Sequence, residues 1–293
     1  MTHHDPHEEF SHDDFGGLHR DLAATGAAMD RRGLFRLAAR IGGAVGAFHL
    51  IGCGDTPTSP TAVSTTAGTT TTPTTTTPPT TTNPTSTCSK IPEETQGPFP
   101  GDGSNGPNVL SASGVVRNDI RTSFAGLSGT ADGVPLTIVL NIVSASTCAP
   151  LAGRAVYLWH CDRLGRYSLY SQGVTNQNYL RGTQEADANG RVTFTSIYPG
   201  CYAGRWPHIH FEVYPSLSAA TNVSNRVATS QIALTKDTAD LVYASAGYDG
   251  SARNLSQISL ATDNVFSDGS ALELATVVGS VSGGYTATLT VAI

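Results

Sequence analysis

The 293-residue chain is poor in basic residues, because 17 Lys and Arg stand against 23 Asp and Glu and leave a net charge of −6. Residues 88–293 contain no run of basic residues, whereas a nucleic-acid partner would need a positive stripe to meet its phosphates. The chain also lacks an unbroken apolar stretch long enough to span a bilayer. We therefore expect neither nucleic-acid binding nor a transmembrane helix.

Apolar side chains are nearly missing from residues 56–87, where about half of the residues are Thr and most others are Pro, Ser, Ala or Gly. A segment with so little surface to bury cannot offset the entropy of ordering its backbone. We predict a disordered, proline-stiffened linker at residues 54–87. Folding is left to residues 88–293, about the size of one ordinary domain.

The first 53 residues carry the pattern of an export signal. Residues 30–36 (DRRGLFR) resemble the twin-arginine motif, and a short, weakly apolar stretch follows at residues 41–48. Residues 50–53 (LIGC) resemble the lipobox at which bacterial lipoproteins are cleaved and acylated. We predict a protein exported from the cytoplasm and anchored at the cell envelope through lipidated Cys53. The alternative is an amphipathic amino-terminal helix that carries a chance cysteine.

Four cysteines remain in the predicted domain, and an even number outside the cytoplasm permits two disulfides. Our preferred pairs are Cys88 with Cys148 and Cys161 with Cys201, although three connectivities are open. Free buried thiols are the alternative.

Helical periodicity is scarce in the domain, and strand patterns dominate it. Apolar or alternating residues predict strands at 136–143, 155–160, 191–197, 208–214, 231–234 and 285–293, with one short helix at 238–245. Many short strands separated by Gly and Pro are typical of a β-sandwich. We therefore predict an all-β fold, a β-sandwich with long loops and little helix.

Two histidines stand two positions apart in the alternating segment 208–214. Side chains at this spacing on a strand point to the same face, so His208 and His210 can approach one metal ion. By itself the pair also fits a zinc site, a cupin iron site or a hydrogen-bonded pair without metal. Tyr202 and Arg205 lie just before it, and Tyr167 follows the strand predicted at 155–160.

The oxidation state of the metal follows from the other donors. A ferrous facial triad requires a carboxylate, and Glu212 alone accompanies the histidines at close range. Tyrosinate is a hard, anionic donor suited to ferric iron. Two histidines with two tyrosines therefore favour iron(III).

These residues belong to a series of motifs that resembles the intradiol ring-cleavage dioxygenases, especially their protocatechuate branch. The resemblance extends over residues 91–234. The matching segments are residues 92–99 (PEETQGPF), 150–159 (PLAGRAVYLW), 165–167 (GRY), 187–194 (DANGRVTF), 199–202 (PGCY) and 205–211 (RWPHIHF).

The resemblance implies a catalytic domain at residues 88–293 in which Tyr167, Tyr202, His208 and His210 bind Fe(3+). Tyr167 would be the equatorial tyrosinate and Tyr202 the axial one. It also implies that Arg205 is the active-site arginine and that Gln231 is a glutamine next to the metal ligands. The expected reaction inserts both atoms of O2 into a catechol-type diol. The ring opens between the hydroxylated carbons to a cis,cis-muconate-type product.

This chain departs from the family in features that bear on its substrate and assembly. The connection from Tyr202 to Arg205 is shorter than in typical protocatechuate enzymes, and the helical dimerisation segment of the catechol and hydroxyquinol branches is replaced by the linker. Residues 168–183 form one of the loops expected to set specificity. The particular catechol and the oligomeric state, an oligomer included, are therefore left open.

Two other hypotheses fit part of the sequence. One is a non-catalytic, prealbumin-like β-sandwich that serves as a binding module on a lipid-anchored stalk. The other is a ferrous or zinc enzyme that uses the two histidines with Glu212 or Asp162. Visible colour distinguishes them, because ferric tyrosinate gives a charge-transfer band that the alternatives lack.

Overall fold

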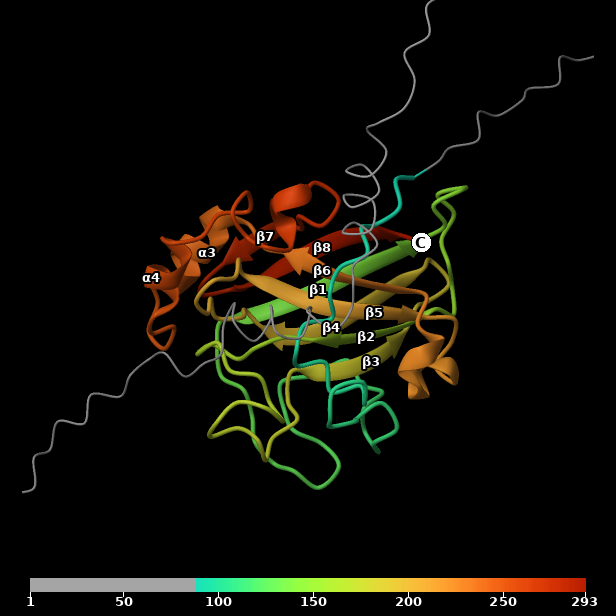
Figure 1. Ribbon diagram of the computed structural model, residues 1–293, viewed down its shortest axis with the longest axis horizontal. Coiled ribbons are helices and arrows are strands. Elements are labelled where there is room, and N and C mark those ends of the chain that lie inside the picture. Colours follow the sequence, from blue (N-terminus) through green and yellow to red (C-terminus); the bar gives the residue numbers. More distant parts are fainter. Residues whose placement is uncertain (1–87) are drawn as a thin grey trace, which may run out of the picture. The chain divides into compact units, whose positions relative to one another are not determined.

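The computed structural model describes residues 88–293, so the predicted export signal, Cys53 and the linker lie outside the described residues. The described chain forms two four-stranded sheets, ordered β4-β1-β8-β7 and β3-β2-β5-β6 (Figure 1). The strands are β1 (Pro135–Val143), β2 (Ala155–Trp159), β3 (Arg181–Glu185), β4 (Arg191–Ile197), β5 (His208–Tyr214), β6 (Ala228–Ala233), β7 (Thr276–Ser280) and β8 (Gly284–Ala292). The predicted all-β sandwich is confirmed.

Helix is a minor component of residues 88–293. The α-helices and 3-10 turns there are η2 (Ala219–Thr221), η3 (Val223–Asn225), α3 (Lys236–Tyr243), α4 (Ser251–Leu255) and η4 (Phe266–Asp268). None of the helices in this part of the chain has the length and apolar character to cross a membrane.

The sandwich core forms because successive side chains of a strand point to opposite faces. In β5, Ile209, Phe211 and Val213 join the same buried cluster as Ile138 and Leu140 of β1. These residues come from the two different sheets, so the cluster lies between them. Burying each large aliphatic or aromatic side chain stabilises the fold by roughly 1.5–3 kcal/mol.

The other face of the β3-β2-β5-β6 sheet is also buried. Tyr157 and Trp159 of β2 form a second cluster there with Tyr167, Tyr202 and other side chains from loops. Loops between residues 99 and 124, teal to green in Figure 1, supply further members of this cluster. Every residue of β5 is consequently buried, including the residues that face away from the sandwich core.

The predicted strands all occur, at β1, β2, β4, β5, β6 and β8, and the predicted short helix is α3. The sequence analysis missed β3 and β7. β3 has the sequence RGTQE, which shows no apolar alternation, and it is a strand because it pairs along its length with β2. The parallel pairing of β1 with β8 was likewise not predicted.

The cysteines agree with one predicted disulfide and contradict the other. Cys88 and Cys148 are bonded, with their Cα atoms 5.4 Å apart. Cys161 and Cys201 are free and buried, so the predicted bond between them is wrong. Each thiol instead donates to a backbone carbonyl, Cys161 to that of Gly200 at 3.4 Å and Cys201 to that of Arg205 at 3.5 Å.

Candidate metal centre

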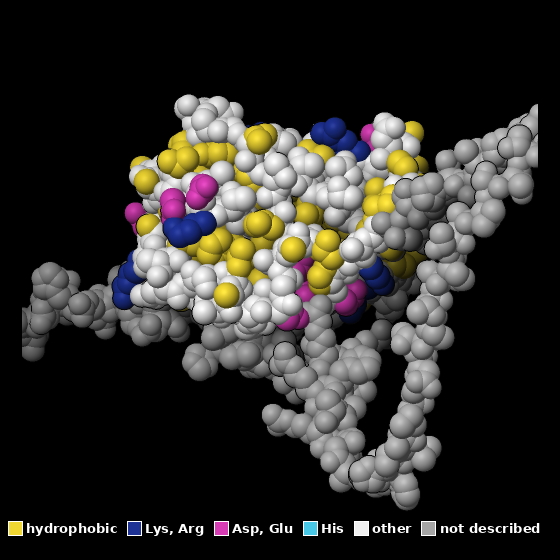
Figure 2. Space-filling view, turned by 90° about the horizontal axis from the view of Figure 1, so that it is seen from above, with side chains coloured by type: hydrophobic (Ala, Val, Ile, Leu, Met, Phe, Trp, Pro, Cys, Tyr) yellow, Lys and Arg dark blue, Asp and Glu magenta, His cyan; other side chains and the backbone are white. Residues whose placement is uncertain are grey.

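The four predicted metal ligands meet at one end of β5. His208 and His210 lie on the same face of this strand, and their Nε2 atoms are 3.1 Å apart. The hydroxyl oxygens of Tyr202 and Tyr167 lie 3.2 Å and 3.3 Å from Nε2 of His208. All four side chains are buried, so two nitrogen and two oxygen donors converge away from bulk water. Among residues 88–293, no histidine shows on the face of the molecule drawn in Figure 2.

Two close backbone approaches bring the tyrosines together. Gly165 has φ of +79°, and a Cβ at this position would lie 2.9 Å from Cβ of Tyr202. Gly200 donates its N–H to the carbonyl of Asp162, and a Cβ there would lie 2.6 Å from the carbonyl oxygen of Arg163. Only glycine fits these positions, and their packing sets the segment of Tyr202 against the turn that leads to Tyr167.

The histidine pair is held in its neutral form. Nδ1 of His208 lies 2.5 Å from the carbonyl oxygen of Trp206; because a carbonyl can only accept, Nδ1 carries the proton and Nε2 keeps its lone pair. Burial, and then the charge of Arg205, hold the pKa of His208 well below its usual value. Burial, and then His208 and Arg205, do the same for the pKa of His210. Neutral imidazole is the form that binds metal ions.

Trp159 orients the second histidine by stacking. Its ring lies parallel to that of His210, with centroids 5.0 Å apart and an interplanar angle of 5°. Nδ1 of His210 has no hydrogen-bond partner among the described residues. A metal-binding histidine commonly donates its second nitrogen to an acceptor, so here the indole takes over the orienting role.

The polar atoms of this cluster converge on one point. Three polar groups, Nε2 of His210 and the hydroxyls of Tyr167 and Tyr202, surround the single lone pair on Nε2 of His208 at 3.1–3.3 Å. A cation among these atoms could be bound by all four side chains, because imidazole nitrogens and phenol oxygens are both metal-binding groups. The donor set therefore fits a metal ion.

Arg205 and Gln231 also come together beside the histidines. Nη2 of Arg205 donates to Oε1 of Gln231 at 2.7 Å, and Nε2 of Gln231 donates to the carbonyl of Thr95 at 2.8 Å. Gln231 is the strand partner of His210 in the β5–β6 register. The two residues predicted from the sequence to accompany the metal ligands therefore lie next to them.

Asp263 was missed by the sequence analysis. Its carboxylate forms an ion pair with Nε of Arg205 at 3.0 Å, and both side chains are fully buried. It stands 58 residues after Arg205 in a segment with no recognisable motif. No local pattern in the sequence could have indicated it.

Neither Glu212 nor Asp162 is placed to serve as the carboxylate ligand of the alternative ferrous or zinc site. Glu212 shares the histidine face but is fully buried rather than solvated, and its Oε2 accepts from the hydroxyl of Tyr214 at 2.5 Å. Burial raises its pKa to about 8. Asp162 instead caps the turn before Tyr167 by accepting the N–H groups of Leu164 and Arg166. Within residues 88–293, no group of three His, Cys, Asp or Glu side chains is placed to hold a metal.

Arg181, also missed, fixes the loop that covers Tyr167. Its Nη atoms donate to the carbonyls of Pro100 at 2.6 Å, Phe99 at 2.9 Å and Ser168 at 2.9 Å. The ring of Phe99 lies 5.0 Å from that of Tyr167. The motif at residues 92–99 is thereby tied to the neighbourhood of the candidate ligands.

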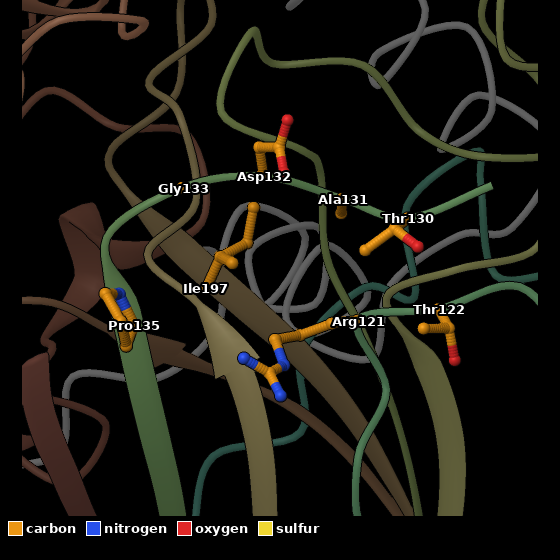
Figure 3. A pocket seen from close by; sticks show the side chains of 8 residues that line it. All are labelled: Arg121, Thr122, Thr130, Ala131, Asp132, Gly133, Pro135 and Ile197. Atoms are coloured by element: carbon orange, nitrogen blue, oxygen red, sulfur yellow. The ribbon is translucent and has the colours of Figure 1, made fainter.

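A separate surface cleft of about 270 Å³ contains none of the predicted site residues (Figure 3). Its lining includes Arg121, Thr130, Asp132 and Ile197. Arg121 is committed to Asp119, which accepts from Nη2 at 2.7 Å. The cleft offers no cluster of reactive groups.

Comparisons with known proteins show which family and fold this chain resembles. Residues 105–208 match the family model described as Dioxygenase, a span that includes Tyr167, Tyr202, Arg205 and His208. The fold is similar to an intradiol ring-cleavage dioxygenase from Tetranychus urticae, with 25% identity and a TM-score of 0.54 over 70% of this chain and 95% of that one. A second crystal structure of a dioxygenase gives 25% identity and a TM-score of 0.56 over 70% of this chain and 94% of that one. The resemblance to the intradiol ring-cleavage dioxygenases inferred from the motifs is thus confirmed, whereas its protocatechuate branch stays a prediction.

Proposed function

We propose that this chain, whose family match and fold are those of the intradiol ring-cleavage dioxygenases, opens a catechol-type ring with O2 between its two hydroxylated carbons. The observation that carries the proposal is the convergence of four donor atoms. Nε2 of His210 and the phenol oxygens of Tyr167 and Tyr202 all lie 3.1–3.3 Å from Nε2 of His208. The buried Arg205 beside them adds a fixed positive charge.

Tyr167, Tyr202, His208 and His210 are the residues that would hold ferric iron. Two neutral nitrogens and two phenol oxygens, the latter anionic when ionised, are a donor set that balances much of the charge of Fe(3+). When bound, ferric iron supplies Lewis-acid and electron-accepting chemistry that makes a catechol reactive towards O2.

The protein's own residues then handle protons and charge. The ionised phenolate oxygen of Tyr202 would accept a proton from a substrate hydroxyl and become a neutral phenol, while Tyr167, packed under Phe99, stays in place. Arg205 is charged at any working pH and stabilises the negative charge that develops on the ring. Gln231 holds Nη2 of that guanidinium. Burial of all these groups excludes water and strengthens each electrostatic interaction.

The proposal includes the location predicted from the sequence. Export by the twin-arginine route would deliver a folded protein, and acylation of Cys53 would anchor it at the cell envelope. Support for this part comes from the sequence pattern of residues 30–53 alone.

The test uses the purified full chain loaded with iron. We expect a visible charge-transfer band that changes when a catechol is added anaerobically, followed by O2 consumption and a ring-opened product. A panel of catechol, protocatechuate and hydroxyquinol, with the position of ring opening determined, identifies the substrate. An iron-loaded protein that stays colourless with and without catechol would refute the proposal and favour the binding-module hypothesis.

A further inference from the structure

A fully buried ion pair joins the loop before β5 to the carboxy-terminal part of the chain. Oδ2 of Asp263 accepts from Nε of Arg205 at 3.0 Å and from the backbone N–H of Trp206 at 2.7 Å. Oδ1 accepts from the N–H groups of Val265 at 2.8 Å and Phe266 at 3.2 Å. The carboxylate is thus clamped by three backbone donors from two segments, and the one side chain it contacts through these bonds is Arg205.

The guanidinium is held from two sides as a result. Asp263 fixes Nε, and Gln231, itself anchored on the carbonyl of Thr95, fixes Nη2. A planar group fixed at two of its nitrogens has a defined plane as well as a defined position. It lies close to the histidine pair, since Gln231, to which it donates, is the strand partner of His210.

A contribution to stability does not explain why this buried ion pair is present. Taking two charges out of water costs about as much as their attraction returns, so apolar residues of similar volume often stabilise a fold equally well. A buried charge pair of which one member lies beside a reactive centre is better explained by the orientation it imposes. Residue 263 also lies outside the span 105–208 that matches the dioxygenase family.

We infer that Asp263 is a positioning residue that sets the plane of Arg205 beside the substrate. The inference rests on the proposed function, because the orientation of Arg205 matters for catalysis only if the chain opens a catechol-type ring. Asp263 itself touches neither the candidate metal ligands nor, on this assignment, the substrate; it acts through the arginine.

The main variant is Asp263→Asn in the iron-loaded full chain. Asparagine keeps the shape of the side chain and one acceptor oxygen for Val265 and Phe266, but it brings an N–H group to the donors of Arg205 and Trp206. A displacement of about 1 Å in a group that stabilises charge costs about 100-fold in rate. We expect kcat to fall by about that factor, with KM, iron content and the visible band of the resting protein unchanged.

Asp119→Asn is the matched control, because Asp119 forms the same kind of pair with Arg121 on the surface, at 2.7 Å, away from the candidate ligands. Its kcat should equal that of the wild type. Combining Asp263→Asn with Arg205→Gln discriminates further: if Asp263 acts through Arg205, the double variant is no slower than Arg205→Gln alone. Fully multiplicative losses would mean a merely structural role and would overturn the inference.

Two outcomes separate this inference from the proposed function. An iron-loaded wild type that cleaves no catechol overturns the proposed function. An active wild type together with Asp263→Asn of normal kcat overturns the role of Asp263 alone.

If Asp263→Asn does not fold, Asp263→Glu serves instead, since it keeps the charge and moves it by one methylene. We expect its kcat to lie between 1% and 50% of wild type, on the order of the loss for a small displacement. A wild-type kcat in this variant would show that the position of the carboxylate is unimportant and would overturn the inference.

Discussion

Replacing Gly165 by alanine tests how closely the turn at residues 162–165 sets the position of Tyr202. Gly165 has φ of +79°, a conformation that costs a residue with a side chain about 1–2 kcal/mol. The new Cβ would also lie 2.9 Å from Cβ and 3.5 Å from Cα of Tyr202. Overpacking of this kind costs a further 1–3 kcal/mol, roughly. The expected loss in the free energy of unfolding is therefore about 2–5 kcal/mol.

Gly153→Ala is the matched control. Gly153 has nearly the same backbone conformation, with φ of +74°, but a Cβ there would meet no heavy atom within 4 Å. This variant should lose only the conformational part, about 1–2 kcal/mol. Urea denaturation of both variants measures the difference, which isolates the contact between Gly165 and Tyr202.

The effect on activity should also differ between the Gly165→Ala and Gly153→Ala variants. In Gly165→Ala the phenol of Tyr202 must move by a few tenths of an ångström or more, so we expect a shifted visible band and a kcat/KM lowered by about 10- to 100-fold. Gly153→Ala should retain the wild-type spectrum and rate. Equal stability, spectra and rates in the two variants would refute the claim that the turn positions Tyr202.

Three further predictions concern the ligands, the pH dependence and the disulfide. Tyr202→Phe should keep iron but slow catechol binding, whereas His208→Ala should lose the metal; metal analysis and stopped-flow absorbance measure both. Burial lowers the pKa of His160 to about 4, so as the pH falls this histidine is protonated in the unfolded chain at a higher pH than in the folded protein. The free energy of unfolding should therefore drop by about 3 kcal/mol between pH 6.5 and 4. The dependence of the unfolding free energy on pH should be weaker in His160→Gln. An unchanged dependence would contradict a lowered pKa of His160. Removing the bond between Cys88 and Cys148, which are 60 residues apart, should cost about 4 kcal/mol in urea denaturation.

Strand positions were readable from the sequence wherever one residue in two was apolar. The segment 208–214 became β5 with the predicted bounds, and 191–197 became β4. β3 has no such alternation, and it forms because β2 offers it a hydrogen-bonding partner. Prediction therefore failed where pairing, rather than the segment's own side chains, decided the conformation.

The cysteines illustrate a different limit. Their number permitted two disulfides, yet only Cys88 and Cys148 are bonded. Cys161 and Cys201 sit on segments that touch, but their sulfur atoms are directed to the carbonyls of Gly200 and Arg205. Side-chain direction depends on the packed backbone, which a count of cysteines does not contain.

By itself, the sequence determined that the protein is a β-sandwich and that His208 and His210 share a face, because the two-residue period of a strand is a local property. Its motifs also pointed to Tyr167, Tyr202 and Arg205. Only the tertiary structure decided that Tyr167 reaches a histidine 41 residues away and that Asp263 holds Arg205 across 58 residues. Such contacts depend on how loops pack over a sheet, and no local periodicity encodes the meeting of segments so far apart in the chain.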